Sequence, residues 1–109
     1  MKAKPMKSVP SGWEPCEPGE ATHVRLCMPG PFANRILTVQ PGSPTGWRWN
    51  GSTESPTLTP SILTRGGVGD VGEYTEHVCH SFVTDGRVQF LSDCTHEFAG
   101  QTVDLLEVD

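Results

Sequence analysis

Apolar and polar residues alternate along several short stretches of the chain, and this alternation predicts β-strands. In the stretch 22–28, Val24 and Leu26 fall on one face while His23 and Arg25 fall on the other. Further short strands are expected at residues 35–40, 47–49, 61–64 (as an edge strand) and 102–108. Proline and glycine separate these stretches, which is typical of strands joined by turns.

The clearest predicted element is a β-hairpin over residues 77–93. Its turn is Asp85-Gly86, and an Asp-Gly pair between two alternating runs favours a two-residue connection. Such a turn places Val83 opposite Val88, and the register continues in pairs back along both strands.

This register predicts which side chains share a face of the sheet. It puts His77, Cys79 and Cys94 on one side, and His96 joins them if the strand continues. It puts His80 on the opposite face, unless a β-bulge changes the direction of its side chain.

Length and composition limit the architecture to one small domain. The chain has 109 residues, of which 35% are hydrophobic, with 12 glycines and 10 prolines. So much loop with so small a core favours an all-β fold stabilised by a bound metal. We predict a flexible arm over residues 1–12, followed by a single zinc-binding β domain over residues 13–109. That domain is expected to be a small sandwich or partly open barrel of about six or seven short strands.

The charge argues against several classes of partner. The net charge is −5, and the one basic cluster is Lys2, Lys4 and Lys7, so nucleic acid is not expected to bind. A nucleic-acid mimic is disfavoured too, because the negative charge is spread evenly along the chain. No apolar run reaches about 20 residues, and residues 1–9 lack the apolar part of a signal peptide. These features predict a cytoplasmic protein that acts through another protein, and they leave its oligomeric state open.

Histidines and cysteines carry the main chemical signal. Cys79, Cys94 and His96, with His77 or His80, bring soft sulfur and nitrogen ligands onto one hairpin. Mixed Cys/His sets are typical of zinc. Because no export signal is expected, reduced thiols that bind a metal are favoured over a disulfide.

Two long segments of the chain also resemble a known family. They are Trp47-Arg48-Trp49-Asn50-Gly51 with Pro56 to Leu63, and Cys79 to His96 followed by Ala99-Gly100-Gln101-Thr102-Val103. The run is similar to an uncharacterised family of small bacterial and phage proteins, and the resemblance covers residues 47–105. Members are often labelled putative ammonia monooxygenase, a membrane-enzyme chemistry that does not suit this chain.

The resemblance implies a zinc site made by a Cys-His pair and a Cys-x-His pair. It therefore gives Cys79, His80, Cys94 and His96 as ligands, and this is the set that we predict. The register argument gives His77 in place of His80. An N-terminal knuckle of the family would add Cys16 or His23, although a second knuckle cysteine is missing here.

Two functions follow as expectations. The first is a non-enzymatic, zinc-stabilised interaction or accessory module, encoded by a phage or prophage. The alternative is a metal-dependent hydrolase with an open zinc position and Asp93 or Glu97 as general base. Ser61 and Ser81 have no His/Asp partners that the sequence alone identifies, so a serine triad is not predicted.

Overall fold

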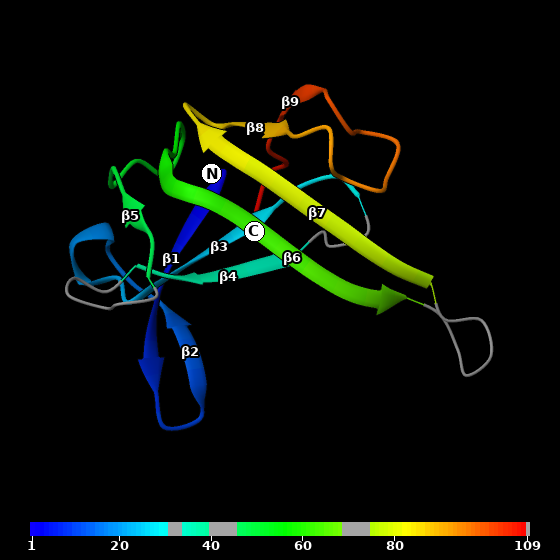
Figure 1. The fold of residues 1–109 in the computed structure, drawn as a ribbon. Helices are drawn as coiled ribbons and strands as arrows, with labels where there is room; N and C mark the ends of the chain where they lie inside the picture. Colours follow the sequence, from blue (N-terminus) through cyan, green and yellow to red (C-terminus); the bar gives the residue numbers. More distant parts are fainter. Residues whose placement is uncertain (31–33, 40–45, 69–74, 109) are drawn as a thin grey trace.

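The computed structural model describes residues 1–30, 34–39, 46–68 and 75–108, which form two antiparallel sheets (Figure 1). The first sheet has the order β2-β1-β3-β4 and the second the order β5-β6-β7-β8-β9. The strands of the first sheet are β1 (Ala3–Val9), β2 (Gly12–Pro15), β3 (His23–Cys27) and β4 (Asn34–Thr38). Those of the second are β5 (Arg48–Trp49), β6 (Leu58–Val68), β7 (Thr75–Thr84), β8 (Arg87–Phe90) and β9 (Thr102–Asp104). The all-β prediction is confirmed, although these residues form nine strands rather than six or seven.

The predicted N-terminal arm is instead part of the first sheet. Strand β1 pairs with both β2 and β3, and Ala3 and Pro5 point into the core. Lys2 and Lys4 alternate with the buried Ala3 and Pro5, so the start of the segment has the two-residue period of a strand. The prediction was wrong because it gave more weight to lysine and proline content than to this alternation.

One hydrophobic core joins the two sheets. Val24 and Leu26 from β3 are fully buried, as the alternation in residues 22–28 predicted. They belong to the same core cluster as Val83, Val88 and Phe90 from the second sheet. Trp47 and Trp49 pack against this cluster from its margin. Burial of these side chains is the main force that holds the sheets together.

The predicted hairpin is present with the expected register. Strands β7 and β8 pair with Val83 opposite Val88, and the turn residues Asp85 and Gly86 have φ values of 50° and 78°. Two positive φ values are typical of the type I′ turn that Asp-Gly favours. Strand β8 ends at Phe90, earlier than predicted, and the chain then turns back toward β7.

Strands β6 and β7 form the longest pair and lie side by side along their length in Figure 1. Strand β6 was expected at an edge, but it lies between β5 and β7. Pro60 is tolerated there because the β6–β7 register shifts between Leu58 and Ile62. The described part of the chain contains no helix that is long and apolar enough to cross a membrane.

Candidate active site

Three polar side chains meet on the outer face of the second sheet. The Nε2 atom of His80 lies 3.0 Å from the Oγ atom of Ser61. The Nδ1 atom of the same ring lies 3.0 Å from an Oδ atom of Asp93. Both ring nitrogens of His80 are therefore engaged, one by a hydroxyl and the other by a carboxylate.

Each member of this group comes from a different element. His80 lies on β7, where its neighbours Cys79 and Ser81 are buried, so alternation directs His80 away from the core. Ser61 lies on β6 within the shifted part of the register. Asp93 follows β8 in the segment that turns back toward β7, where the Leu91 amide donates a hydrogen bond to the His80 carbonyl (2.9 Å).

The two serines that the sequence offered differ completely in environment. Ser61 is half-buried, and its carbonyl accepts a hydrogen bond from the indole nitrogen of Trp47 at 3.3 Å. Ser81 is fully buried in the core, and its hydroxyl has no hydrogen-bond partner among the described residues. Only Ser61 combines access from solvent with a basic partner.

This geometry is that of an activated serine nucleophile. A histidine that contacts the hydroxyl through Nε2 can accept its proton as the oxygen attacks a carbonyl carbon. A carboxylate on Nδ1 fixes the tautomer and orientation of the ring and stabilises the imidazolium that forms. Side-chain exposures of 25% for His80 and 57% for Asp93 leave the pair within reach of a substrate.

A second group of side chains lies on the other side of β7. The ligand atoms of Cys79, Cys94 and His96 all lie within 4.8 Å of one another. Cys79 and Cys94 are buried, and the His96 ring packs edge-on against Phe90. Three of the four predicted metal ligands are thus brought together.

The other ligand candidates lie outside this group. His80 uses its ring nitrogens for Ser61 and Asp93 instead, because it points to the opposite face of β7. His23 lies on β3, in the first sheet, where its ring contacts Trp13, and Cys16 follows β2. The side chain of His77 lies outside the described part of the structure.

The two carboxylates proposed as general bases also differ. Asp93 is bonded to His80, whereas Glu97 is exposed. Asp93 therefore contacts a histidine in this arrangement and lies outside the group of Cys79, Cys94 and His96. The backbone carbonyl of Glu97 accepts a hydrogen bond from the side-chain amide of Gln101.

The residues of the three-ligand group fit a thiophilic metal ion. Burial raises the pKa of the Cys79 thiol, the nearby Cys94 raises it further, and the Arg35 guanidinium partly opposes both effects. Metal binding would displace these thiol protons. The ligand atoms of a tetrahedral zinc site lie about 3.3–3.8 Å apart, so a small contraction of the present spacing would suffice. Gly30 lies next to the His96 ring. A Cβ atom added at Gly30 would lie 3.7 Å from that ring.

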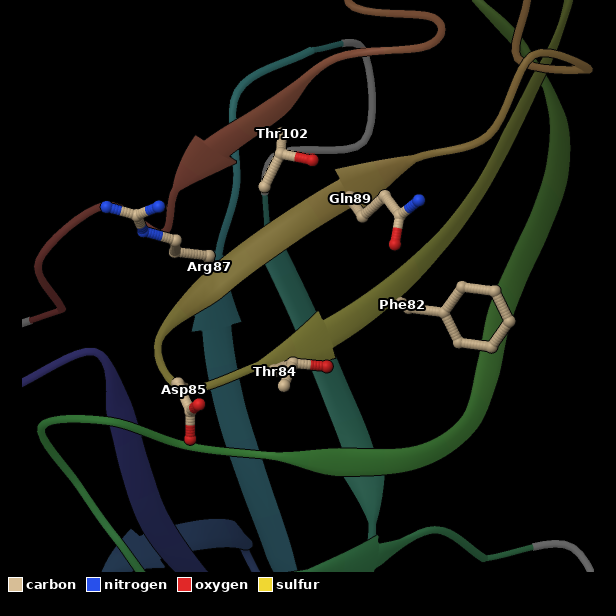
Figure 2. A pocket seen from close by; sticks show the side chains of 6 residues that line it. All are labelled: Phe82, Thr84, Asp85, Arg87, Gln89 and Thr102. Carbon is tan, nitrogen blue, oxygen red and sulfur yellow. The ribbon is translucent and has the colours of Figure 1, made fainter.

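A pocket of about 390 Å³ lies on the same face of the second sheet as His80. Figure 2 shows the side chains that line it, which come from β7, the turn, β8 and β9. They are Phe82, Thr84, Asp85, Arg87, Gln89 and Thr102. Phe82 follows His80 by two positions on β7, so one end of the pocket lies about 7 Å from His80.

The contact between Ser61 and His80 was not expected from the sequence. No local motif surrounds Ser61, and its partners follow it in the chain by 19 and 32 positions. One signal was available: the hairpin register placed His80 on the face opposite the cysteines. A histidine on that face needed a different partner from the metal.

Comparison with known proteins gives one family. The model of the family described as bacterial ubiquitination-like system serine protease (BubE) matches residues 9–91. The match includes Ser61 and His80 and ends just before Asp93. Neither the search of curated proteins nor the search of solved structures found a match.

This match corrects the expected function. A serine protease family contradicts the expectation of a non-enzymatic module, and nothing in the comparison supports a phage or prophage origin. The expectation rested on a closed set of four metal ligands that includes His80, whereas the ring nitrogens of His80 contact Ser61 and Asp93 in this structure. The family is bacterial, in agreement with the coarser part of the resemblance, and the monooxygenase label has no support.

Proposed function

The chain belongs to the BubE family of bacterial ubiquitination-like system serine proteases, and we propose that Ser61 is its nucleophile. The observation that carries this proposal is the pair of 3.0 Å contacts that the His80 ring makes with Ser61 and Asp93. The family description names the catalytic residue type, and Ser61 is the serine that has a histidine and a carboxylate in series.

The reaction would proceed in two stages. In the first, His80 takes the proton of Ser61 while the serine oxygen attacks the scissile carbonyl carbon, and the protonated ring then gives that proton to the leaving amine. In the second, His80 activates a water that cleaves the ester on Ser61 and releases the acid. Asp93 holds the ring in place during both stages. Trp47 supports the nucleophile through its bond to the Ser61 carbonyl.

The substrate would be a polypeptide of a bacterial ubiquitination-like system. Leu63, directly opposite His80 in the sheet, and Phe82 are large apolar side chains with exposures of 51% and 42%. Exposed apolar residues next to a nucleophile are typical of a surface that contacts substrate. The pocket beyond Phe82 would accept a substrate side chain on one side of the cleaved bond.

Zinc is the ion that we propose for Cys79, Cys94 and His96. Two thiolates and an imidazole suit zinc better than calcium or magnesium, which prefer oxygen ligands. When bound there, zinc would cross-link the two segments that carry its ligands. Its ligands point to the inner side of β7, whereas Ser61 and His80 meet on the outer side, so the proposed proton transfers involve only side chains of the protein.

Labelling with a fluorophosphonate tests the assignment of the nucleophile. This reagent forms a covalent bond with activated serines, so wild-type protein should gain one adduct, which peptide mapping would locate at Ser61. The variant Ser61→Ala should lose labelling, and the matched variant Ser81→Ala should keep it.

Hydrolysis of peptide pools by the same three proteins would then identify the cleaved sequence. Loss of at least about 10⁴-fold in rate is expected for Ser61→Ala. Labelling at another serine, or equal hydrolysis by wild type and Ser61→Ala, would reject Ser61 as the nucleophile.

A further inference from the structure

The metal-ligand group and the catalytic group are joined by the chain itself. Cys79 precedes His80, and Asp93 precedes Cys94. His80 and Asp93 are therefore each joined by a peptide bond to a cysteine of the metal-ligand group. A force that brings the two cysteines together also brings His80 and Asp93 together.

Hydrogen bonds strengthen this connection. The His80 amide donates to the Sγ atom of Cys94 at 3.2 Å, and that thiol donates to the His80 carbonyl at 3.1 Å. Next to them, the Thr95 amide donates to the Val78 carbonyl at 3.0 Å. With a metal bound, the Cys94 thiolate would keep the bond that it accepts from the His80 amide and would lose the one that its thiol donates, because metal binding removes the proton.

Asp93 lies in the short segment between β8 and the metal-ligand residues Cys94 and His96. It follows the end of β8 and lies outside any strand, and its side chain is more than half exposed. Backbone hydrogen bonds hold the segment on either side of it: the Leu91 amide donates to the His80 carbonyl at 2.9 Å, and the Thr95 amide donates to the Val78 carbonyl. Cys94 lies between these two anchors with its sulfur on the His80 backbone, so a metal on Cys94 would add a further restraint next to Asp93.

We propose that Cys79, Cys94 and His96 form a metal-held clamp that positions His80 and Asp93 for catalysis. The clamp makes the serine protease depend on a bound metal that lies on the other face of β7 from the substrate. This inference rests on the proposed protease function for its effect on activity. Its structural part, metal-dependent ordering of His80, stands on the group's own contacts.

Metal removal from the whole protein provides the first test. Protein loaded with zinc and protein treated with a chelator would be compared under reducing conditions. The measurements are bound zinc by native mass spectrometry, hydrogen exchange of the His80 amide by NMR, and the rate of fluorophosphonate labelling. Without zinc, exchange at His80 should rise at least about tenfold because the amide loses its fixed acceptor. Labelling should fall at least about tenfold, because misplacement of a catalytic group by about 1 Å can cost 10²-fold, and zinc should restore both.

Substitutions separate the clamp from general destabilisation. His96→Ala removes one ligand but leaves the Cys94 sulfur next to His80, so it should lower zinc binding, His80 protection and labelling together. Cys16→Ala, at a cysteine outside the group, should change none of them. A circular dichroism spectrum of each variant checks that the fold is retained. Should Cys94→Ala fail to fold, the chelator and His96→Ala still decide the question.

The outcomes distinguish the two proposals. Absence of zinc binding, or zinc removal that changes neither His80 exchange nor labelling, would overturn the clamp. If zinc controls exchange at His80 while no form of the protein labels at Ser61, the clamp stands and the protease assignment fails.

Discussion

The two faces of strand β7 differ in both packing and chemistry. On the inner face, Cys79, Ser81 and Val83 are at most 2% exposed and lie in the shared core. On the outer face, His80 bonds to Ser61 and Asp93, and Phe82 is 42% exposed beside a pocket. Successive residues of one strand thus belong to two different groups, Cys79 to the Cys/His group and His80 to the group with Ser61 and Asp93, because side chains alternate between faces.

This separation has a consequence for the chemistry. A buried thiol pair suits a metal that cross-links the chain, because solvent does not compete for the ligands. A nucleophile needs access to substrate, so it belongs on the outer face. The strand keeps the two requirements apart while the peptide bond between Cys79 and His80 keeps the two sites in fixed relation.

The largest effect is expected from substitutions of His80 and Cys79, which lie on opposite faces of β7. His80→Gln should reduce hydrolysis and Ser61 labelling by about 10⁴-fold, because the general base is lost. Its melting temperature should stay close to that of wild type, since the side chain is outside the core. Cys79→Ala should lower the melting temperature by about 5 °C or more and also lose zinc, because it removes a buried ligand. Thermal unfolding and labelling of both variants measure this, and equal stability losses would remove the distinction between faces.

A smaller effect is expected for the carboxylate. Asp93→Asn should lower kcat by about 10²–10³-fold, below the ~10⁴-fold known for a buried triad aspartate, because water can reach this exposed position. Its zinc content should match wild type, since Asp93 is not a ligand. A variant that keeps full kcat would show that His80 needs no carboxylate, and one that loses zinc would place Asp93 in the metal group.

The smallest effect is expected for Phe82, on the outer face of β7. Phe82→Ala should raise KM about five- to twentyfold with little change in kcat, because it removes apolar contact with substrate but no catalytic group. Ile36→Ala is the matched control, since Ile36 is 43% exposed on β4 in the first sheet. Michaelis–Menten kinetics on the identified peptide give both constants. A fall in kcat at constant KM would instead assign Phe82 to positioning of the triad.

The sequence predicted the fold class and the hairpin because both depend on local rules. Alternation predicted β3, and the Asp85-Gly86 turn predicted the register of β7 and β8. That register also placed His80 opposite the cysteines, which agrees with its contacts. The family motif instead grouped His80 with Cys79, Cys94 and His96 as metal ligands. The predicted ligand set followed the motif and therefore includes His80.

What the sequence determined by itself is the all-β class, the β7–β8 hairpin and three of the four predicted metal ligands: Cys79, Cys94 and His96. All three lie within one hairpin and the turn that follows it, so short-range pairing brings them close. The catalytic group required the tertiary structure. Ser61 comes from β6, and its contact with His80 depends on the β6–β7 pairing and on the register shift between Leu58 and Ile62. The register shift that brings Ser61 to His80 depends on burial of the whole core, and no local pattern around Ser61 encodes it.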